Sequence, residues 1–185
     1  SDLPKDVFQG HAQYSPVGAI HLPGYKIHTD GHAGQIRRAA QMMWESKKPM
    51  VYAGGGIIHG AAHDELRELV ELLDSPAVCT LMGLGGLPSD HPNFISMPGM
   101  HGSYAANMGI TGADLLIALG VRFDDRVTGR LAAFAPHAKV IHVDIDPAEI
   151  GKNRAADLPI VGDVKKVLSK RSEEHTPELQ SRQYL

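Results

Sequence analysis

The stretch GVRFDDRVTGR, residues 120–130, contains the residues of this chain whose types and spacing best suit cofactor chemistry. Arg122 and Arg126 offer planar forks of hydrogen-bond donors that match phosphate oxygens, and Asp124 can accept hydrogen bonds from ribose hydroxyls. The alternative is a surface ion-pair cluster, which would stabilise the fold by only about 0–1 kcal/mol. Because the stretch directly follows the apolar run LLIALG (115–120), we expect these side chains at a strand's carboxyl end, where α/β proteins bind ligands.

Three further segments combine glycine with apolar residues after apolar runs: GGG at 54–56, TLMGLGG at 80–86 and MPGMHGS at 97–103. Glycine lets the backbone approach a ligand closely, and methionine offers soft apolar surface for a flat ring system. A tight turn without a ligand explains the glycines equally well, and the spacing G-x-G-x-x-G is not met cleanly. His101 can donate a hydrogen bond to a ligand or cap a helix, and the residues by themselves leave both interpretations open.

The segment HVDIDP (142–147) places Asp144 at the end of another predicted strand, where nucleotide-binding α/β folds hold a carboxylate against a ribose. His142, Asp144 and Asp146 alternate along it, but without further acidic residues nearby in sequence a metal site is the less favoured interpretation. The chain has no G-x-S-x-G elbow, Walker loop or zinc-deaminase signature, and Cys79 stands in no nucleophile motif. The sequence therefore predicts a binding domain with no catalytic residue and no metal ligand of its own.

Short apolar runs alternate with amphipathic segments along most of the chain, and these elements must position the residues described above. Ile36, Ala39, Ala40 and Met43, for example, recur at helical spacing before Pro49 ends the pattern. The alternation predicts an α/β fold with a Rossmann-like, mostly parallel sheet and helices on both faces. The predicted strands are 50–54, 77–82, 115–120 and 139–146, and the predicted helices are 32–46, 64–73, 103–110 and 163–170.

The composition is that of an ordinary globular domain, since 43% of the 185 residues are hydrophobic and 21% are charged. The formal charge of −3 provides no basic surface for a phosphate backbone, so we expect no nucleic-acid partner. No apolar run approaches the roughly 20 residues that span a bilayer, so we expect no membrane association. The single cysteine excludes an internal disulfide framework and a cysteine-rich zinc site.

The chain divides into three predicted parts. Residues 1–31 carry scattered proline and glycine without a sustained period, so we expect an interdomain linker and the end of a preceding domain. Residues 32–170 form the predicted cofactor-binding domain. Residues 171–185 continue no helical pattern, and RSEEHTPELQS resembles the translation of a sequencing-library adapter. We expect a non-native tail there, the alternative being a disordered polar tail. Because the chain begins with Ser1 instead of methionine, we expect it to be cut from a longer protein.

Three motifs in the order MPGMHG, GVRFDDRVTG and DIDPAEIGKN make the chain similar to the central domain of acetolactate synthase over residues 2–168. The resemblance implies that the intact protein condenses pyruvate with pyruvate or 2-oxobutyrate to 2-acetohydroxy acids. This carboligation belongs to the transferase class and to the biosynthesis of valine, leucine and isoleucine. The resemblance also implies that the catalytic residues lie in other domains, so that the present chain alone is expected to be inactive.

By the same resemblance, the central domain binds FAD, and the other domains of the intact enzyme bind thiamine diphosphate and Mg²⁺. The implied assembly is a homodimer or homotetramer of the catalytic subunit with a small regulatory subunit, in the bacterial cytoplasm. The implied contacts to FAD come from the ends of several predicted strands and from the loops that follow them. The expected cofactor-binding residues are Gly54, Gly55, Gly56, Thr80, Leu81, Met82, Gly99, Met100, His101, Gly120, Arg122, Asp124, Arg126, Val127, Asp144, Ile145, Asp163 and Val164.

Other functions remain as alternatives. Glyoxylate carboligase and pyruvate oxidase resemble the chain through the same central domain. The motifs GVRFDDRVTG and DIDPAEIGKN argue against the oxidase and leave glyoxylate carboligase as the nearer alternative. A stand-alone nucleotide-binding or electron-transfer module is the alternative from another class, since electron-transfer flavoproteins and sirtuins have related folds. A sirtuin would need four zinc-binding cysteines, and this chain has one cysteine.

Overall fold

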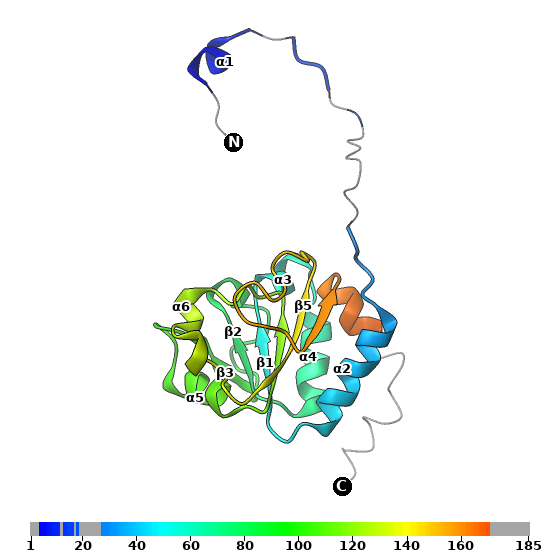
Figure 1. The fold of residues 1–185 in the computed structure, drawn as a ribbon, viewed down its shortest axis with the longest axis vertical. Helices are drawn as coiled ribbons and strands as arrows, with labels where there is room; N and C mark the ends of the chain where they lie inside the picture. Colours follow the sequence, from blue (N-terminus) through cyan, green and yellow to red (C-terminus); the bar gives the residue numbers. More distant parts are fainter. Residues whose placement is uncertain (1–3, 12, 17, 19–26, 171–185) are drawn as a thin grey trace.

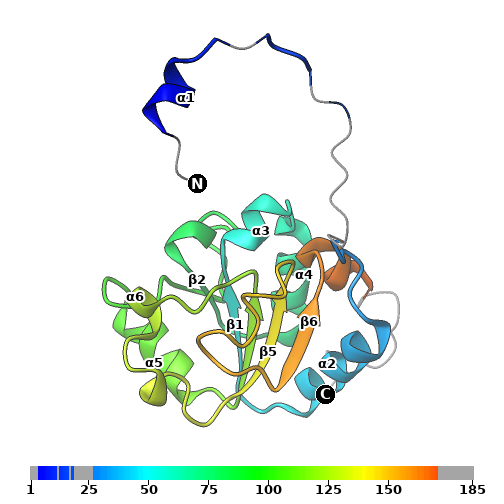
Figure 2. The same ribbon diagram turned by 45° about the horizontal axis from the view of Figure 1, so that its top comes forward.

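The computed structural model describes residues 4–11, 13–16, 18 and 27–170. Within these residues the chain forms a six-stranded parallel sheet in the order β3-β2-β1-β4-β5-β6 (Figure 1, Figure 2). The strands are β1 (Pro49–Ala53), β2 (Ala77–Cys79), β3 (Phe94–Ser96), β4 (Leu115–Leu119), β5 (Lys139–Asp144) and β6 (Leu158–Val161). The helices are α1 (Lys5–Gln9), α2 (Ala33–Glu45), α3 (Gly55–His59), α4 (His63–Leu73), α5 (Tyr104–Gly112), α6 (Asp125–Thr128), the 3-10 helices η1 (Leu81–Gly83) and η2 (Leu131–Ala133), and a last helix over 164–170.

Different helices cover the two faces of the sheet. Successive strand residues point to opposite faces, so β1, β4 and β5 contribute side chains to two separate buried clusters. One buried cluster joins the sheet to α2, α4 and the last helix, and the other joins it to α5 and to the segment 121–138. All residues of β4 and all but the first of β1 and β5 are buried. Each fully buried valine, leucine or isoleucine contributes about 1.5–3 kcal/mol, so these three strands are the stable centre of the domain.

The sheet confirms the predicted α/β class. The four predicted strands correspond to β1, β2, β4 and β5, and the four predicted helices to α2, α4, α5 and the last helix. The predicted strand 77–82 is too long, since Thr80 accepts a hydrogen bond from the amide of Gly83 (3.1 Å) and begins η1. The predicted domain limits at 31 and 170 stay predictions, and the predicted tail, 171–185, lies outside the described residues.

The chain changes direction across the sheet between β1 and β4. From β1 it proceeds to β2 and β3 on one side, and then returns to place β4, β5 and β6 on the other side. The connections that follow β1 and β4 run to opposite sides of the sheet. This creates a crevice outside the carboxyl ends of the two strands, where open parallel sheets bind ligands. The fold therefore indicates where a ligand site is to be sought. Among the described residues, no helix has the length and apolar character needed to cross a membrane.

Candidate functional site

Glycines allow the carboxyl ends of β1 and β4 to approach each other at this crevice. The amide of Gly56 donates to the carbonyl of Gly120 at 3.1 Å, and the amide of Gly54 donates to that of Leu119 at 2.9 Å. A Cβ atom on Gly56 would lie 2.6 Å from the Cα of Gly120, and Gly120 itself has a φ of +59°. Backbone packing alone thus requires glycine at Gly54, Gly56 and Gly120. A tight turn therefore explains Gly54 and Gly56 of the GGG segment without a ligand.

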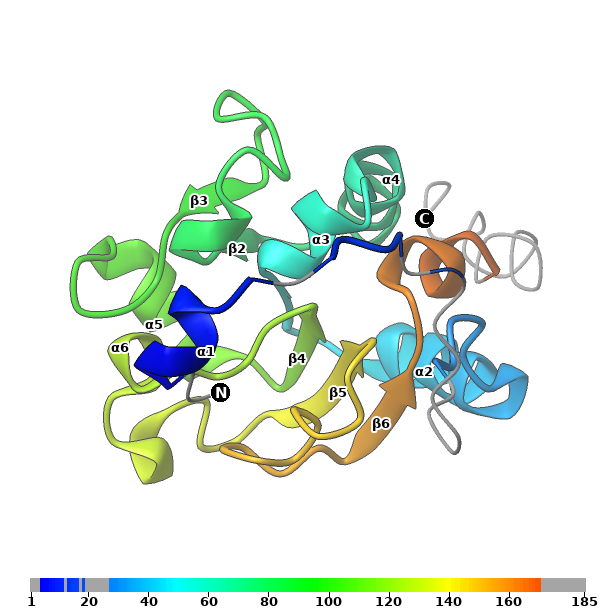
Figure 3. The same cartoon turned by 90° about the horizontal axis from the view of Figure 1, so that it is seen from above.

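A cavity of about 790 Å³ opens beside these glycines, at the carboxyl ends of the strands. Figure 3 looks down on this end of the sheet and shows α3, α6 and the ends of β5 and β6. The cavity has the size of a small-molecule site, which commonly measures roughly 300–1,000 Å³. Fourteen of the expected cofactor-binding residues line it: Gly55, Gly56, Thr80, Leu81, Met82, Gly120, Arg122, Asp124, Arg126, Val127, Asp144, Ile145, Asp163 and Val164.

The structure does not place the other four expected residues, Gly54, Gly99, Met100 and His101, in the lining. Gly99 is instead held by Asn107, whose side chain accepts from its amide at 2.8 Å and donates to its carbonyl at 3.1 Å. The amide of Met100 donates to the carbonyl of Arg126 at 3.2 Å, while the Met100 side chain is 70% exposed. This loop therefore lies next to the cavity and supports its wall, and a ligand contact from it stays a prediction.

Seven lining residues were not predicted from the sequence. Two of them are aromatic: Tyr52 and Phe123 meet edge to face, with ring centroids 5.7 Å apart, and form the apolar floor. Burial, assisted by the charge of Asp124, raises the pKa of Tyr52, so its hydroxyl stays protonated. The position of Tyr52 near the end of an apolar strand was a usable signal that sequence reasoning missed. The remaining five are His59, Gly60, Val121, Asp146 and Glu149.

The two arginines of the lining are exposed and only loosely paired. The side chain of Arg122 is 69% exposed and lies 3.9 Å from Asp124, and that of Arg126 is 80% exposed and lies 3.9 Å from Asp125. Exposed pairs at this separation contribute about 0–1 kcal/mol, so they restrain the guanidinium groups weakly. Both forks therefore remain able to bind an anion. Asp124 also caps α6 through the amide of Arg126 (3.1 Å), and this hydrogen bond is the main cause of its lowered pKa.

Two carboxylates also line the cavity, those of Asp144 and Asp163. Asp144, the last residue of β5, is buried and accepts from the amide of Asp146 at 2.9 Å. Burial raises the pKa of Asp144, although this hydrogen bond opposes the shift. Asp163 begins the last helix, where it accepts from the amide of Lys166 at 3.1 Å. A carboxylate at each of these strand ends suits the hydroxyl groups of a ribose.

The alternation of His142, Asp144 and Asp146 does not build a metal centre in the structure. The imidazole Nε2 of His142 donates to the carbonyl oxygen of Val121 at 2.8 Å, below the floor of the cavity. Within the described residues, no group of three histidine, cysteine, aspartate or glutamate side chains could hold a metal ion. His142 therefore contacts the loop that carries Arg122, and it is not a candidate metal ligand.

His142 makes the stability of the domain dependent on pH. Burial lowers its pKa from 6.5, and the hydrogen bond to Val121 opposes that shift. The unfolded chain thus binds this proton more readily, so the contribution of neutral His142 is complete above pH 6.5 and is lost as the pH falls below it. We expect a slope of at most about 1.4 kcal/mol per pH unit from this one proton. Urea denaturation between pH 7.5 and 5.5 measures it.

The variant His142→Phe tests whether His142 causes this pH dependence. A variant is needed because Asp144, with its raised pKa, changes the free energy of unfolding in the opposite direction as the pH falls. The variant keeps an aromatic ring against Phe123 and removes the titrating group. Its stability should fall less with decreasing pH than that of the wild type, whereas the exposed control His63→Gln should keep the wild-type slope. A slope unchanged in His142→Phe would contradict the assignment.

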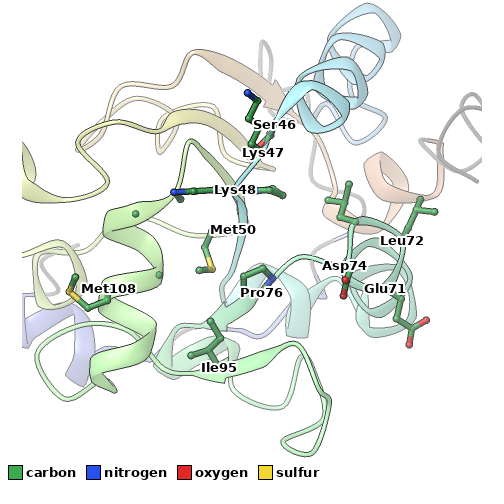
Figure 4. A pocket seen from close by; sticks show the side chains of 15 residues that line it. Ser46, Lys47, Lys48, Met50, Glu71, Leu72, Asp74, Pro76, Ile95 and Met108 are labelled. Carbon is green, nitrogen blue, oxygen red and sulfur yellow. The ribbon is translucent and has the colours of Figure 1, made fainter. Parts of the chain in front are cut away.

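A larger cavity, of about 1000 Å³, lies at the opposite, amino-terminal ends of the strands (Figure 4). Its walls carry Lys47, Lys48, Met50, Ile95 and Met108, and none of the residues expected from the sequence lies there. Size does not decide between the two cavities, because parallel sheets bind ligands at the carboxyl ends of their strands. The carboxyl-end cavity, with its arginines and carboxylates, is the candidate site.

Comparison with known proteins identifies the family. Residues 36–170 match the family described as "Thiamine pyrophosphate enzyme, central domain". The chain is 58% identical to "Acetolactate synthase" of Mycobacterium avium over 91% of its own length and 27% of the relative's. It is 54% identical to "Probable acetolactate synthase large subunit" of Methanocaldococcus jannaschii, over 90% of the chain and 29% of that protein. It is 48% identical to "Acetolactate synthase isozyme 3 large subunit" of Escherichia coli strain K12, over 93% and 30%.

These relatives confirm the resemblance stated from the motifs. The chain spans less than a third of the length of each of the three, and the matched family describes a single domain within larger enzymes. The matched residues, 36–170, contain all six strands of the parallel sheet. The chain therefore belongs to the thiamine pyrophosphate enzyme family, through the central domain of such an enzyme.

Proposed function

We propose that this chain is the FAD-binding central domain of an acetolactate synthase large subunit. The observation that carries the proposal is one cavity of about 790 Å³ that joins arginines, carboxylates and exposed apolar side chains at the carboxyl ends of the strands. Leu81 and Met82 are 68% and 66% exposed, and Ile145 is 46% exposed, all three beside the cavity. Apolar side chains so exposed are typical of a surface that a ligand covers.

The lining residues fit the parts of FAD by their chemistry. Arg122 and Arg126 would bind the diphosphate through charge-assisted hydrogen bonds, and Asp144 and Asp163 would accept from ribose hydroxyls. Leu81 and Met82 would pack against an apolar ring system. Condensing two 2-oxo acids with loss of carbon dioxide involves no net oxidation or reduction. Bound FAD would therefore have a structural role and stabilise the domain. The chain's own residues then bind and orient the cofactor.

The role of the intact protein is proposed from its relatives. It would condense pyruvate with pyruvate or 2-oxobutyrate, as a step in valine, leucine and isoleucine biosynthesis, in the bacterial cytoplasm. Membership of the family implies thiamine diphosphate as the reacting cofactor, and Mg²⁺ would hold its diphosphate in a different domain. The catalytic subunit would form a homodimer or homotetramer and bind a small regulatory subunit. Three relatives named acetolactate synthase support these proposals.

Titration of the 185-residue chain with FAD tests the proposed binding. We expect saturable quenching of flavin fluorescence with one site per chain, competition by ADP, and weaker binding of FMN, which lacks the adenosine end. The variant Lys47→Ala, in the amino-end cavity, is the control and should bind FAD like the wild type. An absence of saturable binding, or equal binding of FMN and FAD, would contradict the proposed site.

The chain alone should not make acetolactate. By the resemblance, the groups that activate thiamine diphosphate and hold its diphosphate belong to other domains, and the chain spans less than a third of the length of its relatives. We expect acetolactate production from pyruvate, with thiamine diphosphate, Mg²⁺ and FAD added, to equal the rate of the blank. The complete large subunit assayed alongside is the positive control. Acetolactate formed by the purified 185-residue chain above that blank would refute this prediction.

A further inference from the structure

The loop over residues 121–124, which presents Arg122 and Asp124 to the cavity, is held in an unfavourable backbone conformation. Phe123 has a φ of +49°, in the left-handed region that residues with a Cβ rarely adopt. Such a conformation persists only where the surrounding structure enforces it, and it is often found at ligand sites. Two side chains that lie outside the cavity lining, those of His142 and Asn153, bond to the carbonyl groups of this loop.

Asn153 holds the loop from its solvent side. Its side-chain amide donates to the carbonyl of Arg122 at 3.1 Å and to the carbonyl of Phe123 at 3.2 Å. The segment that carries Asn153 is itself anchored, since the guanidinium of Arg154 donates to the carbonyls of Ala135 (3.2 Å) and Ala138 (3.4 Å). The two carbonyls on either side of the strained Phe123 Cα atom are therefore fixed to a part of the chain about thirty residues downstream.

His142 holds the loop from the protein interior. Its side chain is fully buried, and because a carbonyl only accepts, the 2.8 Å contact with Val121 requires the proton on Nε2. The Nδ1 atom is buried without a hydrogen-bond partner among the described residues, so the neutral ring is the form that fits. The ring also meets Phe123 edge to face, with centroids 5.0 Å apart. His142 therefore contacts both the backbone and the side chain of the loop.

We propose that Asn153 and His142 are positioning residues for the cofactor: they fix the backbone of 121–123 so that Arg122 and Asp124 face the bound flavin nucleotide. This inference rests on the proposed function. A positioning role explains why the exposed Asn153, which does not line the cavity, donates its side-chain amide to two consecutive carbonyl groups. A loop released from these contacts would relax toward negative φ at Phe123 and turn the Arg122 fork away from the diphosphate.

The variant Asn153→Asp tests the inference, because it keeps the shape of the side chain and replaces the donor with a carboxylate facing two carbonyl oxygens. We expect FAD to bind about 10- to 100-fold more weakly, the loss that follows from one charge-assisted contact. The matched control is Asn93→Asp, directly before β3, where the side-chain amide of Asn93 donates to Asp74 at 3.0 Å. The control should bind FAD like the wild type.

Combining Asn153→Asp with Arg122→Ala separates a positioning role from general destabilisation. If Asn153 acts through Arg122, the double variant should bind FAD scarcely more weakly than Arg122→Ala alone, since interacting residues are non-additive. Losses of affinity that multiply, or an unchanged affinity in Asn153→Asp, would overturn the inference.

Hydrogen exchange without flavin gives a second measurement. Asn153→Asp, and likewise His142→Gln, should raise the amide exchange rates in residues 120–128 and leave those of β1 and β4 unchanged. Exchange rates in 120–128 equal to those of the wild type would also overturn the inference. If the wild type binds no FAD, the proposed function fails instead, which the titration of the wild type shows directly.

Discussion

Replacing Gly120 with alanine is expected to lower the free energy of unfolding by about 3 kcal/mol or more. Its φ of +59° penalises any Cβ by about 1–2 kcal/mol. The added atom would also lie 2.5 Å from the Cα, 3.0 Å from the N and 3.2 Å from the C of Gly56. These are backbone atoms in the first turn of α3, so relief requires α3 to move away from the end of β4, and overpacking of this kind costs about 1–3 kcal/mol. Urea denaturation followed by circular dichroism measures the loss.

Two other glycines separate these causes. Gly85 has a φ of +90° but no atom within 4 Å of its Cβ position, so Gly85→Ala should show the backbone penalty alone, about 1–2 kcal/mol. Gly112, at the end of α5, has neither problem, so Gly112→Ala should change stability by about 0.5 kcal/mol or less. A Gly120→Ala variant as stable as Gly112→Ala would contradict the close packing of Gly120 against Gly56.

Replacing Arg122 with alanine is expected to weaken FAD binding about 10- to 100-fold, corresponding to a charge-assisted hydrogen-bonding group worth roughly 1.5–3 kcal/mol. The guanidinium is 69% exposed and 3.9 Å from Asp124, too far for a hydrogen bond, so its donors are available to phosphate oxygens. The change removes little from the fold itself. Fluorescence titration of wild type and variant at the same ionic strength measures the difference.

The control for Arg122→Ala is Arg38→Ala, which removes the same charge from the exposed face of α2. It should change FAD affinity less than about twofold, because charges farther apart than about 10 Å are largely screened at 0.1 M salt. Added salt should weaken binding more in the wild type than in Arg122→Ala. Equal affinities for the wild type and Arg122→Ala would remove this residue from the site.

The centre of the fold was predictable from sequence, and the edges were not. The strands β1, β4 and β5 are buried on both faces, so they stand out as continuous apolar runs. The strand β3 is three residues long and only half-buried, and β6 carries the exposed Pro159, which is tolerated there because β6 is an edge strand. Each is only three or four residues long, and Ser96 in β3 and Pro159 in β6 weaken the strand pattern further.

The site was predictable to the extent that strand ends define it. Residues such as Arg122 and Asp144 follow apolar runs directly, and parallel strands bring such positions to one edge. His59 and Glu149 could not be placed, since their positions depend on how loops turn after the strands end. The loop that carries Gly99 and His101 also follows a strand, but hydrogen bonds between Gly99 and Asn107 hold it beside the cavity lining, so its contact with a ligand stays a prediction.

Mapping of FAD binding by two-dimensional amide NMR on the 185-residue chain tests the central claim most directly. We expect FAD to shift the amide signals of five residues at the carboxyl ends of four different strands: Gly55, Thr80, Gly120, Arg122 and Asp144. Signals from the amino-end cavity, around Lys48 and Met108, should remain in place. Shifts confined to the amino-end cavity, or no shifts at saturating FAD, would contradict the assignment of this domain as a flavin-binding domain.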